Sequence, residues 1–385
     1  MRRLNVAIVV ESLHSQGGVG RRTSELVRKL LSAGHEVHVY ANRWDPKAAE
    51  GASFHYIPML KLGRAAKPLS FAWFCSALIP RSRHDLIHTQ ARVFRYDVAT
   101  LGVGCHRAYL DAVGIDPEKA PDRRLHRTIL HIERSMLASE RFAAQRRIIV
   151  NSNKCKGELV DYYSVPETSI DVARNGVDHG VFSPDIRASL GPTVRRELGM
   201  SPDELMVLFV GSGFQRKGLD TLIEAVGRLR RGRSLRLFVV GRGKRDEHSR
   251  LAADVGIAEQ LTWIGQSDPS DIVKYYAAAD IFALPTRYDP FANSTMEALA
   301  CGVPVVTTNA NGVSEILRDG TDGLIVEPDE ADALSERLRA LADDADFRTR
   351  LGSNGRVAVE PYTWSKTAER TAAVYETIMA KRSQQ

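Results

Sequence analysis

Two adjacent cations in a glycine-rich loop are the first feature of this sequence that could do chemistry. Arg216 and Lys217 stand within residues 211–218, Gly-Ser-Gly-Phe-Gln-Arg-Lys-Gly, directly after an apolar run. Arginine offers a planar fork of donors and lysine a compact charge, so the pair suits a diphosphate. Solvated loop charges are the alternative explanation of the same two residues. We predict that Arg216 and Lys217 hold a diphosphate at the end of a strand.

Two carboxylates eight residues apart form a second candidate. Asp289 precedes a stretch of helical composition, and Glu297 lies within it. The pattern predicts a helix with Asn293 or Ser294 as its N-cap, so that Glu297 lies about one turn inside. Asp289 can then be explained as an acid that stabilises the helix N-terminus. The alternative is that the backbone N–H groups of residues 291–295 face a phosphate or a sugar, while Glu297 accepts hydrogen bonds from a ribose diol.

A glycine-rich segment near the N-terminus is a third candidate. Gly17, Gly18 and Gly20 precede a helical pattern, with Arg21 beside them. Glycines let backbone N–H groups approach an anion there, and the helix N-terminus adds about half a positive charge. Neither a Walker motif nor a complete dinucleotide fingerprint occurs, and an ordinary glycine turn is the alternative. We predict that Gly17, Gly20 and Arg21 form an acceptor or phosphate loop.

Short β-rich apolar runs alternate with helical patterns through the whole chain. Continuously apolar runs such as residues 205–210 are typical of strands covered on both faces, hence of parallel sheets with crossover helices. In open α/β sheets, ligands bind outside the carboxyl ends of the strands, which is where the three candidate segments lie. The predicted strands are residues 5–10, 36–41, 85–88, 98–105 and 147–152 in the first half, and 206–211, 235–241, 261–265, 280–285 and 303–308 in the second.

The length of 385 residues indicates two domains, each large enough to bury a core. Residues 172–202 are dense in turn residues and are predicted to contain the boundary. The predicted fold class is α/β, with two doubly wound, Rossmann-like parallel-sheet domains facing a cleft. The N-terminal domain is assigned residues 1–172, together with a helix at residues 363–385 that packs back on it. The C-terminal domain is assigned residues 173–362.

Composition places the protein among globular chains and excludes several classes. With 43% hydrophobic residues and 4 scattered cysteines, neither disorder nor a disulfide framework is indicated, and a reducing cytosol fits. The apolar run at residues 5–10 is too short for a signal sequence, and residues 69–80 are too few for a spanning helix of about 20 residues. The net charge of +6 divides into +10 for residues 1–170 (26 Lys+Arg, 16 Asp+Glu) and −4 for residues 171–385 (27 and 31). A basic half is typical of a protein whose partner is nucleic acid, anionic lipid or an acidic substrate.

Taken together, the motifs resemble those of the GT-B retaining glycosyltransferases of family four, and in particular the lipopolysaccharide-core α-glucosyltransferases. The resemblance covers nearly the whole chain and is strongest over residues 206–323. The motifs are specific as a set, far more so than any one of them. They are residues 17–21, the Asn-Gly-Val-Asp of residues 175–178, residues 211–218, the stretch from Asp289 to Glu297, and residues 312–316 and 319–323.

The resemblance implies a UDP-sugar donor, with UDP-glucose expected, bound by the C-terminal domain, and a glycolipid or lipopolysaccharide-core acceptor bound by the N-terminal domain. It also implies a histidine beside the reacting carbon of the donor sugar. His106 matches that position better than His88. For each of the two, the alternative is a histidine at a strand end that makes a structural hydrogen bond. His126 and His131 are expected at the surface. The family motif has Glu where this chain has Asp289, which leaves the identity of the sugar open. The implied catalytic residues are His106 and Asp289, and the implied donor-binding residues are Gly18, Arg216, Lys217, Gly241, Phe291, Ala292, Asn293, Ser294 and Glu297.

No metal ion, and no cofactor besides the nucleotide sugar, is expected. Asp-x-Asp is common beside the diphosphate in metal-dependent glycosyltransferases, but here it occurs only at residues 344–346, in a late charged region that indicates a solvated face. Fixed cations and a helix dipole can stabilise a leaving diphosphate instead. The resemblance implies transfer with retention, in which the departing phosphate oxygen takes the proton of the acceptor.

The basic excess of the N-terminal half predicts peripheral association with the inner face of the cytoplasmic membrane. Each basic group near an anionic leaflet contributes about 1 kcal/mol, and aromatic rings can enter the interface. A solvated basic surface with its aromatic residues in the core is the alternative. For the function as a whole, a nucleotide-sugar epimerase or hydrolase on the same fold and a basic nucleic-acid-binding protein are the alternatives. The two basic and aromatic clusters are Lys61, Arg64, Lys67, Phe71, Trp73, Phe74, Arg81 and Arg83, and Arg107, Tyr109, Arg123, Arg124, His126, Arg127 and Arg134.

Overall fold

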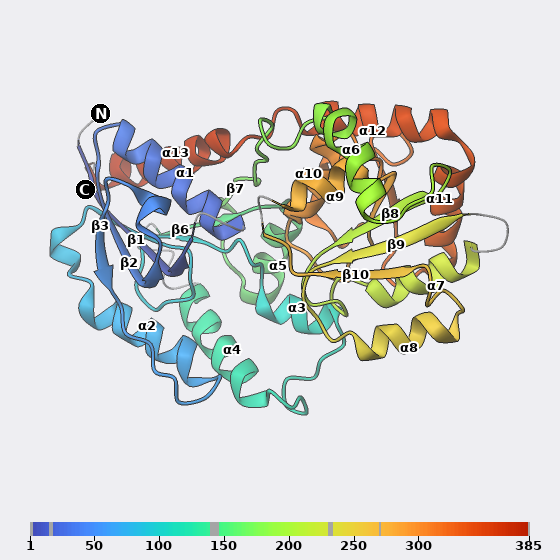
Figure 1. Ribbon diagram of the computed structural model, residues 1–385. Helices are drawn as coiled ribbons and strands as arrows, with labels where there is room; N and C mark the ends of the chain where they lie inside the picture. Colours follow the sequence, from blue (N-terminus) through green and yellow to red (C-terminus); the bar gives the residue numbers. More distant parts are fainter. Residues whose placement is uncertain (1–2, 15–17, 139–145, 230–233, 269–270, 384–385) are drawn as a thin grey trace. The chain divides into compact units, whose positions relative to one another are not determined.

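The computed structural model describes residues 3–14, 18–138, 146–229, 234–268 and 271–383. The chain divides into two compact units (Figure 1). Unit 1 consists of Met1–Gly176 and Trp364–Gln385, and unit 2 consists of Val177–Thr363. Each unit is built on a parallel sheet with flanking helices, which confirms the predicted doubly wound, Rossmann-like class.

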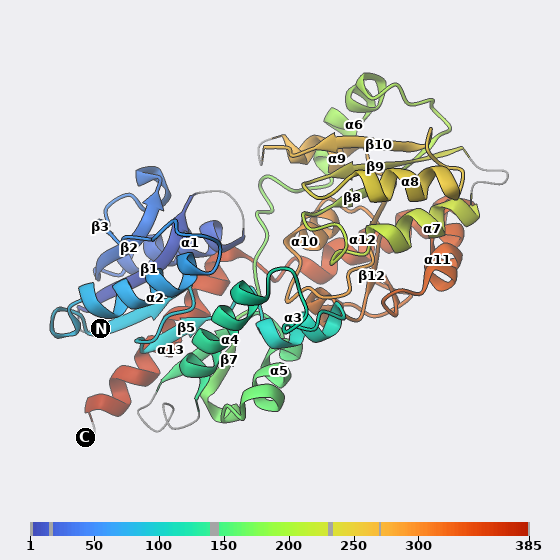
Figure 2. The ribbon, with the colours of Figure 1, turned by 90° about the horizontal axis from the view of Figure 1, so that it is seen from below.

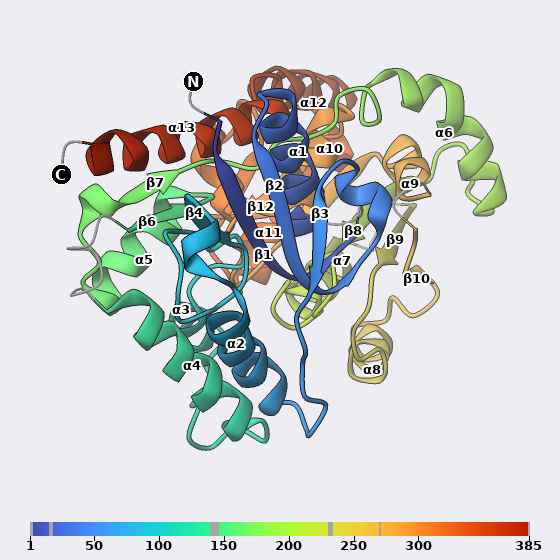
Figure 3. The same ribbon diagram turned by 90° about the vertical axis from the view of Figure 1, so that its left-hand side faces the viewer.

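Within its described residues, unit 1 contains a seven-stranded parallel sheet in the order β3-β2-β1-β4-β5-β6-β7 (Figure 3). β1 pairs with β2 on one side and with β4 on the other, so the strand order reverses at β1. Ligands of open α/β sheets bind at such a reversal, outside the carboxyl ends of the strands. The strands are β1 (Asn5–Leu13), β2 (Glu36–Trp44), β3 (Ser53–Tyr56), β4 (Leu86–Thr89), β5 (Val98–Thr100), β6 (Arg147–Val150) and β7 (Ile170–Val172), and the helices are α1 (Gly18–Ser32), α2 (Ala66–Leu78), α3 (His106–Ala112), α4 (Arg123–Leu137), α5 (Asn153–Tyr163) and α13 (Trp364–Ser383).

The last helix of the chain completes unit 1. α13 packs along α1, and the two helices lie side by side in Figure 1. Val374, Tyr375 and Ile378 of α13 are buried in the same hydrophobic cluster as β1 and α1. Burying such apolar side chains stabilises the packed state by about 2 kcal/mol each. Unit 1 therefore draws part of its core from residues that follow unit 2 in the chain.

The described part of unit 2 contains a six-stranded parallel sheet in the order β10-β9-β8-β11-β12-β13. The order reverses at β8, which lies between β9 and β11. The strands are β8 (Leu205–Val210), β9 (Leu235–Val240), β10 (Leu261–Gly265), β11 (Ile281–Leu284), β12 (Val305–Thr308) and β13 (Leu324–Val326), and the helices are α6 (Asp185–Glu197), α7 (Leu219–Leu229), α8 (Asp246–Asp254), α9 (Ile272–Ala278), α10 (Asn293–Ala300), α11 (Ala331–Asp343) and α12 (Ala345–Val359).

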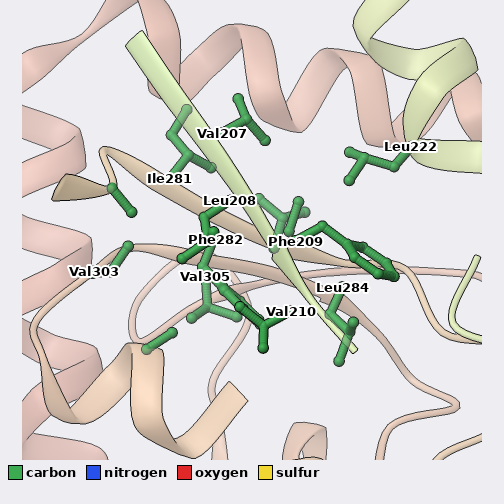
Figure 4. Close-up of a cluster of buried hydrophobic side chains, with 14 of the residues drawn as sticks. Val207, Leu208, Phe209, Val210, Leu222, Ile281, Phe282, Leu284, Val303 and Val305 are labelled. Carbon is green, nitrogen blue, oxygen red and sulfur yellow. The ribbon is translucent and has the colours of Figure 1, made fainter. Parts of the chain in front are cut away.

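The central strands of unit 2 are buried except at Leu205, the first residue of β8. Val207 to Val210 of β8 and Ile281 to Leu284 of β11 contribute to one hydrophobic core (Figure 4). Ile281 pairs with Val207, and Phe282 with Leu208. Because the strands are parallel and in register there, the loops that follow them leave the sheet at the same edge. The core therefore fixes the starting points of the two loops that carry the candidate cations and carboxylates.

The predicted strand at residues 98–105 is too long. β5 ends at Thr100, and the chain then turns, with Gly104 at a φ of 77°. A positive φ is cheap for glycine and costly for other residues, so the turn is encoded by that glycine. His106 consequently begins α3 instead of ending a strand.

The region expected to be dense in turns contains a helix. α6 spans Asp185–Glu197, with Pro192 inside it, and packs on α9. A Cβ at Gly191 would lie 2.8 Å from the Ala277 carbonyl oxygen, so glycine at this position lets the two helices approach closely. The turn-forming residues of this segment thus serve helix packing as well as connection, which composition alone does not distinguish.

Candidate functional site

The loops that follow β8 and β11 are in direct contact. The Arg216 carbonyl oxygen accepts hydrogen bonds from the Arg287 backbone N–H, at 2.9 Å, and from the Thr286 hydroxyl, at 3.0 Å. Gly218 has a φ of 69°, and a Cβ there would lie 1.9 Å from the Pro285 carbonyl oxygen. Only glycine satisfies both the backbone conformation and this approach. Gly218 therefore allows the loop that carries Arg216 and Lys217 to lie directly against the loop that follows β11.

Asp289 is the common partner of both predicted diphosphate ligands. Arg216 Nη1 donates to Asp289 Oδ2 at 3.2 Å and to the Tyr288 carbonyl oxygen at 2.8 Å. Lys217 Nζ donates to the same carboxylate oxygen. The other oxygen, Oδ1, accepts from the Phe291 backbone N–H at 3.1 Å. Three residues predicted as separate ligands are thus brought into one ionic cluster.

Burial and charge act against each other in this cluster. Burial lowers the pKa of Lys217, while Asp289 opposes that shift. Burial alone would raise the pKa of Asp289, but Lys217 and Arg216 outweigh it and hold the pKa below the ordinary value. Two cations beside one carboxylate leave a net positive charge of one, in a place where water screens it poorly. Such a cluster can attract an anion and stabilise negative charge that develops on it.

The start of α10 differs from the prediction. α10 spans Asn293–Ala300 with Ala292 as N-cap, and neither Asn293 nor Ser294 caps it. Asn311 holds the segment instead: its Oδ1 accepts from the Ala292 backbone N–H at 3.2 Å, and its Nδ2 donates to the Thr295 hydroxyl at 3.0 Å. Asn311 was not predicted, because it follows β12 and its role depends on residues up to 19 positions away. Phe291 and Ala292 are buried, whereas Asn293 and Ser294 are half-buried.

Glu297 lies one turn inside α10, as its spacing predicts, and is half-buried. The buried Tyr276 hydroxyl donates to Glu297 Oε2 at 2.9 Å and lies 3.3 Å from the Ser294 carbonyl oxygen. Burial, followed by the nearby Glu297 carboxylate, raises the pKa of Tyr276 well above its ordinary value. The Tyr276 hydroxyl therefore keeps its proton and donates it in a hydrogen bond to one oxygen of Glu297. In this way α9, which carries Tyr276, orients the Glu297 carboxylate. Tyr276 is a second residue that sequence reasoning missed.

Gly241 is required by the backbone geometry beside the cation loop. It has a φ of 139°, and a Cβ there would lie 2.0 Å from the Gly211 carbonyl oxygen. Its N–H donates to the Gly265 carbonyl oxygen at 2.7 Å. Gly241 thus holds the ends of β8, β9 and β10 together, which is a structural role whatever binds above it.

The glycine loop of unit 1 has a comparable close approach. Gly17 lies outside the described residues, and Gly18 is the first residue of α1. A Cβ at Gly20 would lie 1.9 Å from the His14 carbonyl oxygen, so the helix start and the end of β1 require glycine. Arg21 is half-buried on the first turn.

Arg22, which was not predicted, is buried beside that loop. Its Nη2 donates to the Ala173 carbonyl oxygen at 2.7 Å and to Asn175 Oδ1 at 2.5 Å. Its Nη1 has no partner among the residues that the structure describes. Burial lowers the pKa of the Arg22 guanidinium to about 10. Arg22 thereby connects α1 to residues 173–175, just before the chain enters unit 2.

His106 is the first residue of α3, and its backbone is held by Glu133 of α4. Its backbone N–H lies 2.9 and 3.0 Å from the two carboxylate oxygens of Glu133, and its Nε2 lies 3.1 Å from His126 Nδ1. Burial, followed by the charge of Arg92, lowers the pKa of His106 to about 4. The imidazole is therefore neutral at pH 7 and can act as a hydrogen-bond partner. His126 was expected at the surface, but it is half-buried and stacks on His106, whereas His131 is exposed.

His88 fits the structural explanation. It is fully buried, with Nδ1 2.5 Å from the Tyr375 hydroxyl and Nε2 2.8 Å from the Thr100 hydroxyl. Burial, followed by the charge of Arg22, lowers the pKa of His88 to about 3. Both ring nitrogens are engaged inside unit 1, so His88 connects β4 to α13.

The acidic residues show one further structural role. Asp344, the first residue of the Asp-x-Asp string, accepts from the Phe347 backbone N–H at 2.7 Å and caps α12. Among the described residues, no group of three or more His, Cys, Asp or Glu side chains is arranged to hold a metal ion. The residues that the structure gathers in unit 2 are Arg216, Lys217, Gly241, Asp289, Phe291, Ala292, Asn293, Ser294 and Glu297, and those in unit 1 are Gly18, Gly20, Arg21 and His106.

Comparison with known proteins accounts for both units. Residues 16–181 match the family described as Glycosyltransferase Family 4, and residues 192–358 match Glycosyl transferases group 1. An uncharacterized glycosyltransferase of Methanocaldococcus jannaschii is 25% identical over 94% of this chain and 95% of its own length. A D-inositol 3-phosphate glycosyltransferase of Stackebrandtia nassauensis is 30% identical over 95% of this chain and 88% of its own length. The matching protein of that name in Nocardia farcinica aligns over 54% of its length.

Solved structures show the same fold. WaaG, a glycosyltransferase involved in lipopolysaccharide biosynthesis, has a TM-score of 0.79 at 22% identity, over 96% of this chain and 99% of its own. HepE of Anabaena, in complex with UDP-glucose, has a TM-score of 0.70 at 18% identity over the full length of both chains. Since a relative of 30% identity spans nearly all of the sequence and the two family matches cover successive halves, the chain belongs to the GT-B glycosyltransferases.

Proposed function

We propose that this protein is a hexosyltransferase that moves a hexose, with glucose expected, from a UDP-sugar to a glycolipid or lipopolysaccharide-core acceptor. The ionic cluster of Arg216, Lys217 and Asp289 is the observation that carries the donor half of the proposal. It lies at the carboxyl ends of β8 and β11, which is the edge where open α/β sheets bind ligands. The complex of HepE with UDP-glucose supports a uridine nucleotide as the first donor to test.

The diphosphate of the donor is assigned to the cation pair. Arg216 and Lys217 carry two positive charges and Asp289 carries one negative charge, so the cluster has one excess positive charge. A diphosphate entering the loop competes with Asp289 for Lys217. Glu297, oriented by Tyr276, is assigned to the ribose hydroxyls, and Asp289, Asn293 and Ser294 to the sugar end of the donor.

The proposed chemistry is transfer with retention and without a metal ion. Fixed cations stabilise the charge that develops on the leaving diphosphate, which is electrostatic catalysis by preorganised groups. The departing phosphate oxygen accepts the proton of the attacking hydroxyl, so no protein nucleophile is needed. His106, neutral because of its low pKa, is proposed to contact the donor sugar as a hydrogen-bond partner.

A small phosphorylated polyol is the second candidate acceptor. The relative that matches 95% of the chain at 30% identity is named a D-inositol 3-phosphate glycosyltransferase. The resemblance to lipopolysaccharide-core enzymes favours a membrane-borne acceptor instead, as does WaaG, which is involved in lipopolysaccharide biosynthesis. The two acceptors differ in solubility and charge, so direct assay separates them.

A peripheral position on the inner face of the cytoplasmic membrane is proposed for unit 1. α2 and α4 lie side by side (Figure 2), and the surface around their first turns is hollowed by a cavity of about 980 Å³ lined by Arg64, Arg123, Arg124 and Arg127. Trp73 is 59% exposed, whereas Phe71 is buried in the core, so only part of the aromatic cluster is available to an interface. Among the described residues, no helix has the length and apolar character needed to cross a bilayer.

The experiment that tests the proposal is a donor panel. Purified protein is incubated with UDP-glucose, UDP-galactose, GDP-mannose and ADP-glucose, with and without a lipopolysaccharide-core acceptor or D-inositol 3-phosphate, and nucleotide release is measured. UDP release that depends on the acceptor, with an α-linked product by NMR, is the expected result. Equal release without any acceptor would assign a hydrolase, and a new UDP-sugar would assign an epimerase.

A further inference from the structure

Glu133 of α4 is a fully buried carboxylate whose contacts converge on the start of α3. Its two oxygens lie 2.9 and 3.0 Å from the His106 backbone nitrogen, and the Arg107 backbone N–H donates to Oε1 at 3.4 Å. Arg92 Nε donates to Oε2 at 2.7 Å, and the Tyr163 hydroxyl donates to Oε1 at 2.8 Å. One side chain thus joins α3, α4, α5 and the loop after β4, and the three helices pack on one another (Figure 2).

These partners keep the Glu133 carboxylate ionised. Burial would raise the pKa of Glu133, but the charge of Arg92 and the hydrogen bonds from His106 and Tyr163 outweigh it and hold the pKa below its ordinary value. Burial, followed by the Glu133 charge, raises the pKa of Tyr163, so the phenol remains a hydrogen-bond donor. A buried charge is tolerated only where its partners are well placed. The positions of the groups around Glu133 are therefore narrowly defined.

The first turn of α3 has little of its own to hold it. The helix contains 7 residues, His106–Ala112, and its N-cap residue, Cys105, makes no side-chain cap hydrogen bond. So short a helix is unstable by itself in water. The Cys105 thiol lies 3.7 Å from Glu133 Oε1 instead. The position of His106 is therefore set by contacts with α4 more than by the sequence of α3.

The imidazole of His106 is held by the same helix. His126 lies about two turns before Glu133 on α4, on the same face of the helix. Its Nδ1 lies 3.1 Å from His106 Nε2, and the two rings stack with their centroids 5.3 Å apart. Glu133 thus holds the backbone of His106, and His126 holds its ring. Because both contacts come from one helix, His106 is kept in a fixed relation to α4.

We infer that Glu133 is a positioning residue for transfer: it holds the first turn of α3 so that the His106 imidazole meets the donor sugar in the orientation that the reaction needs. This inference rests on the proposed function, in which His106 contacts the donor sugar. Glu133 is fully buried and acts through His106 without touching the substrate. A displacement of about 1 Å in a positioned group can cost about a hundredfold in rate, so loss of the Glu133 contact lowers kcat even where the fold persists.

Glu133→Gln in the full chain is the first variant that tests the inference. The amide keeps the shape of the side chain, but in either orientation its N–H group faces a donor, Arg92 or Tyr163. With UDP-glucose and the active acceptor, kcat is expected to fall at least about tenfold, while the KM for the donor changes less than about twofold. A kcat within about twofold of the unaltered protein would overturn the inference.

Asp97→Asn is the matched control, because Asp97 is also a buried carboxylate of unit 1. Its side chain binds Arg81, Arg382 and the Ile87 backbone N–H, none of which belongs to α3 or α4. Both amide variants are expected to lose stability, because each leaves a cation without its carboxylate. Only Glu133→Gln is expected to lose turnover. Equal losses of kcat in the two variants would reduce Glu133 to a structural residue and overturn the inference.

A double-mutant cycle separates positioning from a general effect on the fold. If Glu133 acts through His106, Glu133→Gln lowers kcat at least about tenfold in the unaltered background but less than about twofold in a His106→Ala background. A fall by the same factor in both backgrounds would contradict the inference, because the effect would then not depend on the His106 side chain.

NMR of isotope-labelled histidine reports the position of His106 without any turnover. The His106 signals are the ones missing from the spectrum of His106→Ala, and they are sensitive to the rings of His126 and Tyr109, whose centroids lie 5.3 and 5.7 Å away. Glu133→Gln is expected to shift these signals and Asp97→Asn to leave them in place. Unshifted signals in Glu133→Gln would overturn the inference. Absence of UDP release by the unaltered protein would overturn the proposed function instead, and the NMR comparison would still decide whether Glu133 positions His106.

Tyr163→Phe is a milder variant for the case that Glu133→Gln does not fold. It removes one hydrogen bond to Glu133 and keeps the charge opposite Arg92. The expected result is a fall in kcat of about threefold and a smaller shift of the His106 signals. Unchanged kcat and unchanged signals would count against the inference. A cooperative melting transition well above the assay temperature shows that a variant is folded.

Discussion

The Lys217 ammonium donates a hydrogen bond to the Asp289 carboxylate, and both side chains are buried. The buried lysine is therefore paired with a carboxylate of the same unit. Burial and the carboxylate act in opposite directions on the pKa of Lys217, and a ligand phosphate would strengthen the second effect. The ion pair holds the cation in place before the ligand arrives, which is the preorganisation that electrostatic catalysis requires.

Removing the cation should reduce transfer. Lys217→Ala and Glu297→Ala are each expected to lower kcat/KM by at least about tenfold, because one loses the charge beside the diphosphate and the other the ribose contact. Steady-state rates with UDP-glucose and the active acceptor measure the effect. Lys381→Ala, at an exposed position on α13, is the matched control. Normal turnover in both active-site variants would reject the assignment of these roles.

Removing the charge of Asp289 should destabilise unit 2. Asp289→Asn keeps the shape of the side chain but leaves Lys217 buried beside a neutral amide. Breaking a buried ion pair on one side costs about 3–5 kcal/mol of the free energy of unfolding. Urea denaturation measures the loss, and Asp346→Asn, at an exposed carboxylate, is expected to change it by less than about 0.5 kcal/mol. A variant as stable as the unaltered protein would mean that Lys217 finds another partner or loses its proton.

Gly218 and Gly213 form a natural pair for testing the contact between the two loops. Both have positive φ, 69° and 77°, but a Cβ at Gly218 would strike the Pro285 carbonyl oxygen, whereas a Cβ at Gly213 would meet open space. Gly218→Ala is therefore expected to lose about 2 kcal/mol more stability than Gly213→Ala, and to bind UDP less tightly. Calorimetry and UDP titration give the two quantities. Equal losses would mean that the loops can separate without cost.

Acid should destabilise unit 1 through His88. Its pKa is about 3 in the folded state, against an ordinary value of about 6.5, so between these values the unfolded chain binds a proton that the folded chain does not. Stability is therefore lost as the pH falls from 6.5 toward 3, by up to about 1.4 kcal/mol per pH unit for this one group. His88→Gln should show a shallower fall in urea midpoint between pH 6.5 and 4.5. An unchanged slope would place the acid sensitivity in other groups.

The basic surface of α4 should govern binding to anionic vesicles. Replacing Arg123, Arg124 and Arg127 by Ser removes three charges and is expected to weaken binding to phosphatidylglycerol vesicles at low salt by about a hundredfold. Vesicle sedimentation of the full chain measures this. The charge-matched control replaces three exposed arginines, Arg339, Arg350 and Arg370, in the same way. Equal weakening in both triple variants would show a dependence on net charge alone, without a docking surface.

Local sequence patterns were enough to predict which loops carry the charged residues, but not which residues those side chains contact. Arg216, Lys217 and Asp289 could be predicted because each follows a strand, and the parallel sheet brings those strand ends together. That Asp289 would pair with Lys217 was not predicted, since the two lie 72 residues apart. Arg22 and Glu133 were also missed. An arginine or glutamate on a helix is ordinarily solvated, and these two are buried only by contacts with residues far away in the sequence.

Helix starts and strand ends were the least predictable parts of the fold. The expected N-cap at Asn293 or Ser294 was wrong: α10 begins after Ala292, and Asn311 fixes that start by binding the Ala292 backbone N–H and the Thr295 hydroxyl. The overlong strand at residues 98–105 was wrong because apolar residues continue into a turn that packs against the core. In both cases tertiary contacts override a local pattern that is itself unambiguous.

The packing of α13 onto α1 also has a consequence for how the protein is made. Unit 2 is continuous in the chain, so all of its strands have left the ribosome before α13 is synthesised. Until α13 is synthesised, the core of unit 1 that includes Leu26 and Leu30 is incomplete. His88 also lacks its hydrogen-bond partner Tyr375 during that time. The unit that is translated first is thus completed last, and during that interval its uncovered apolar surface is open to aggregation or to binding by a chaperone.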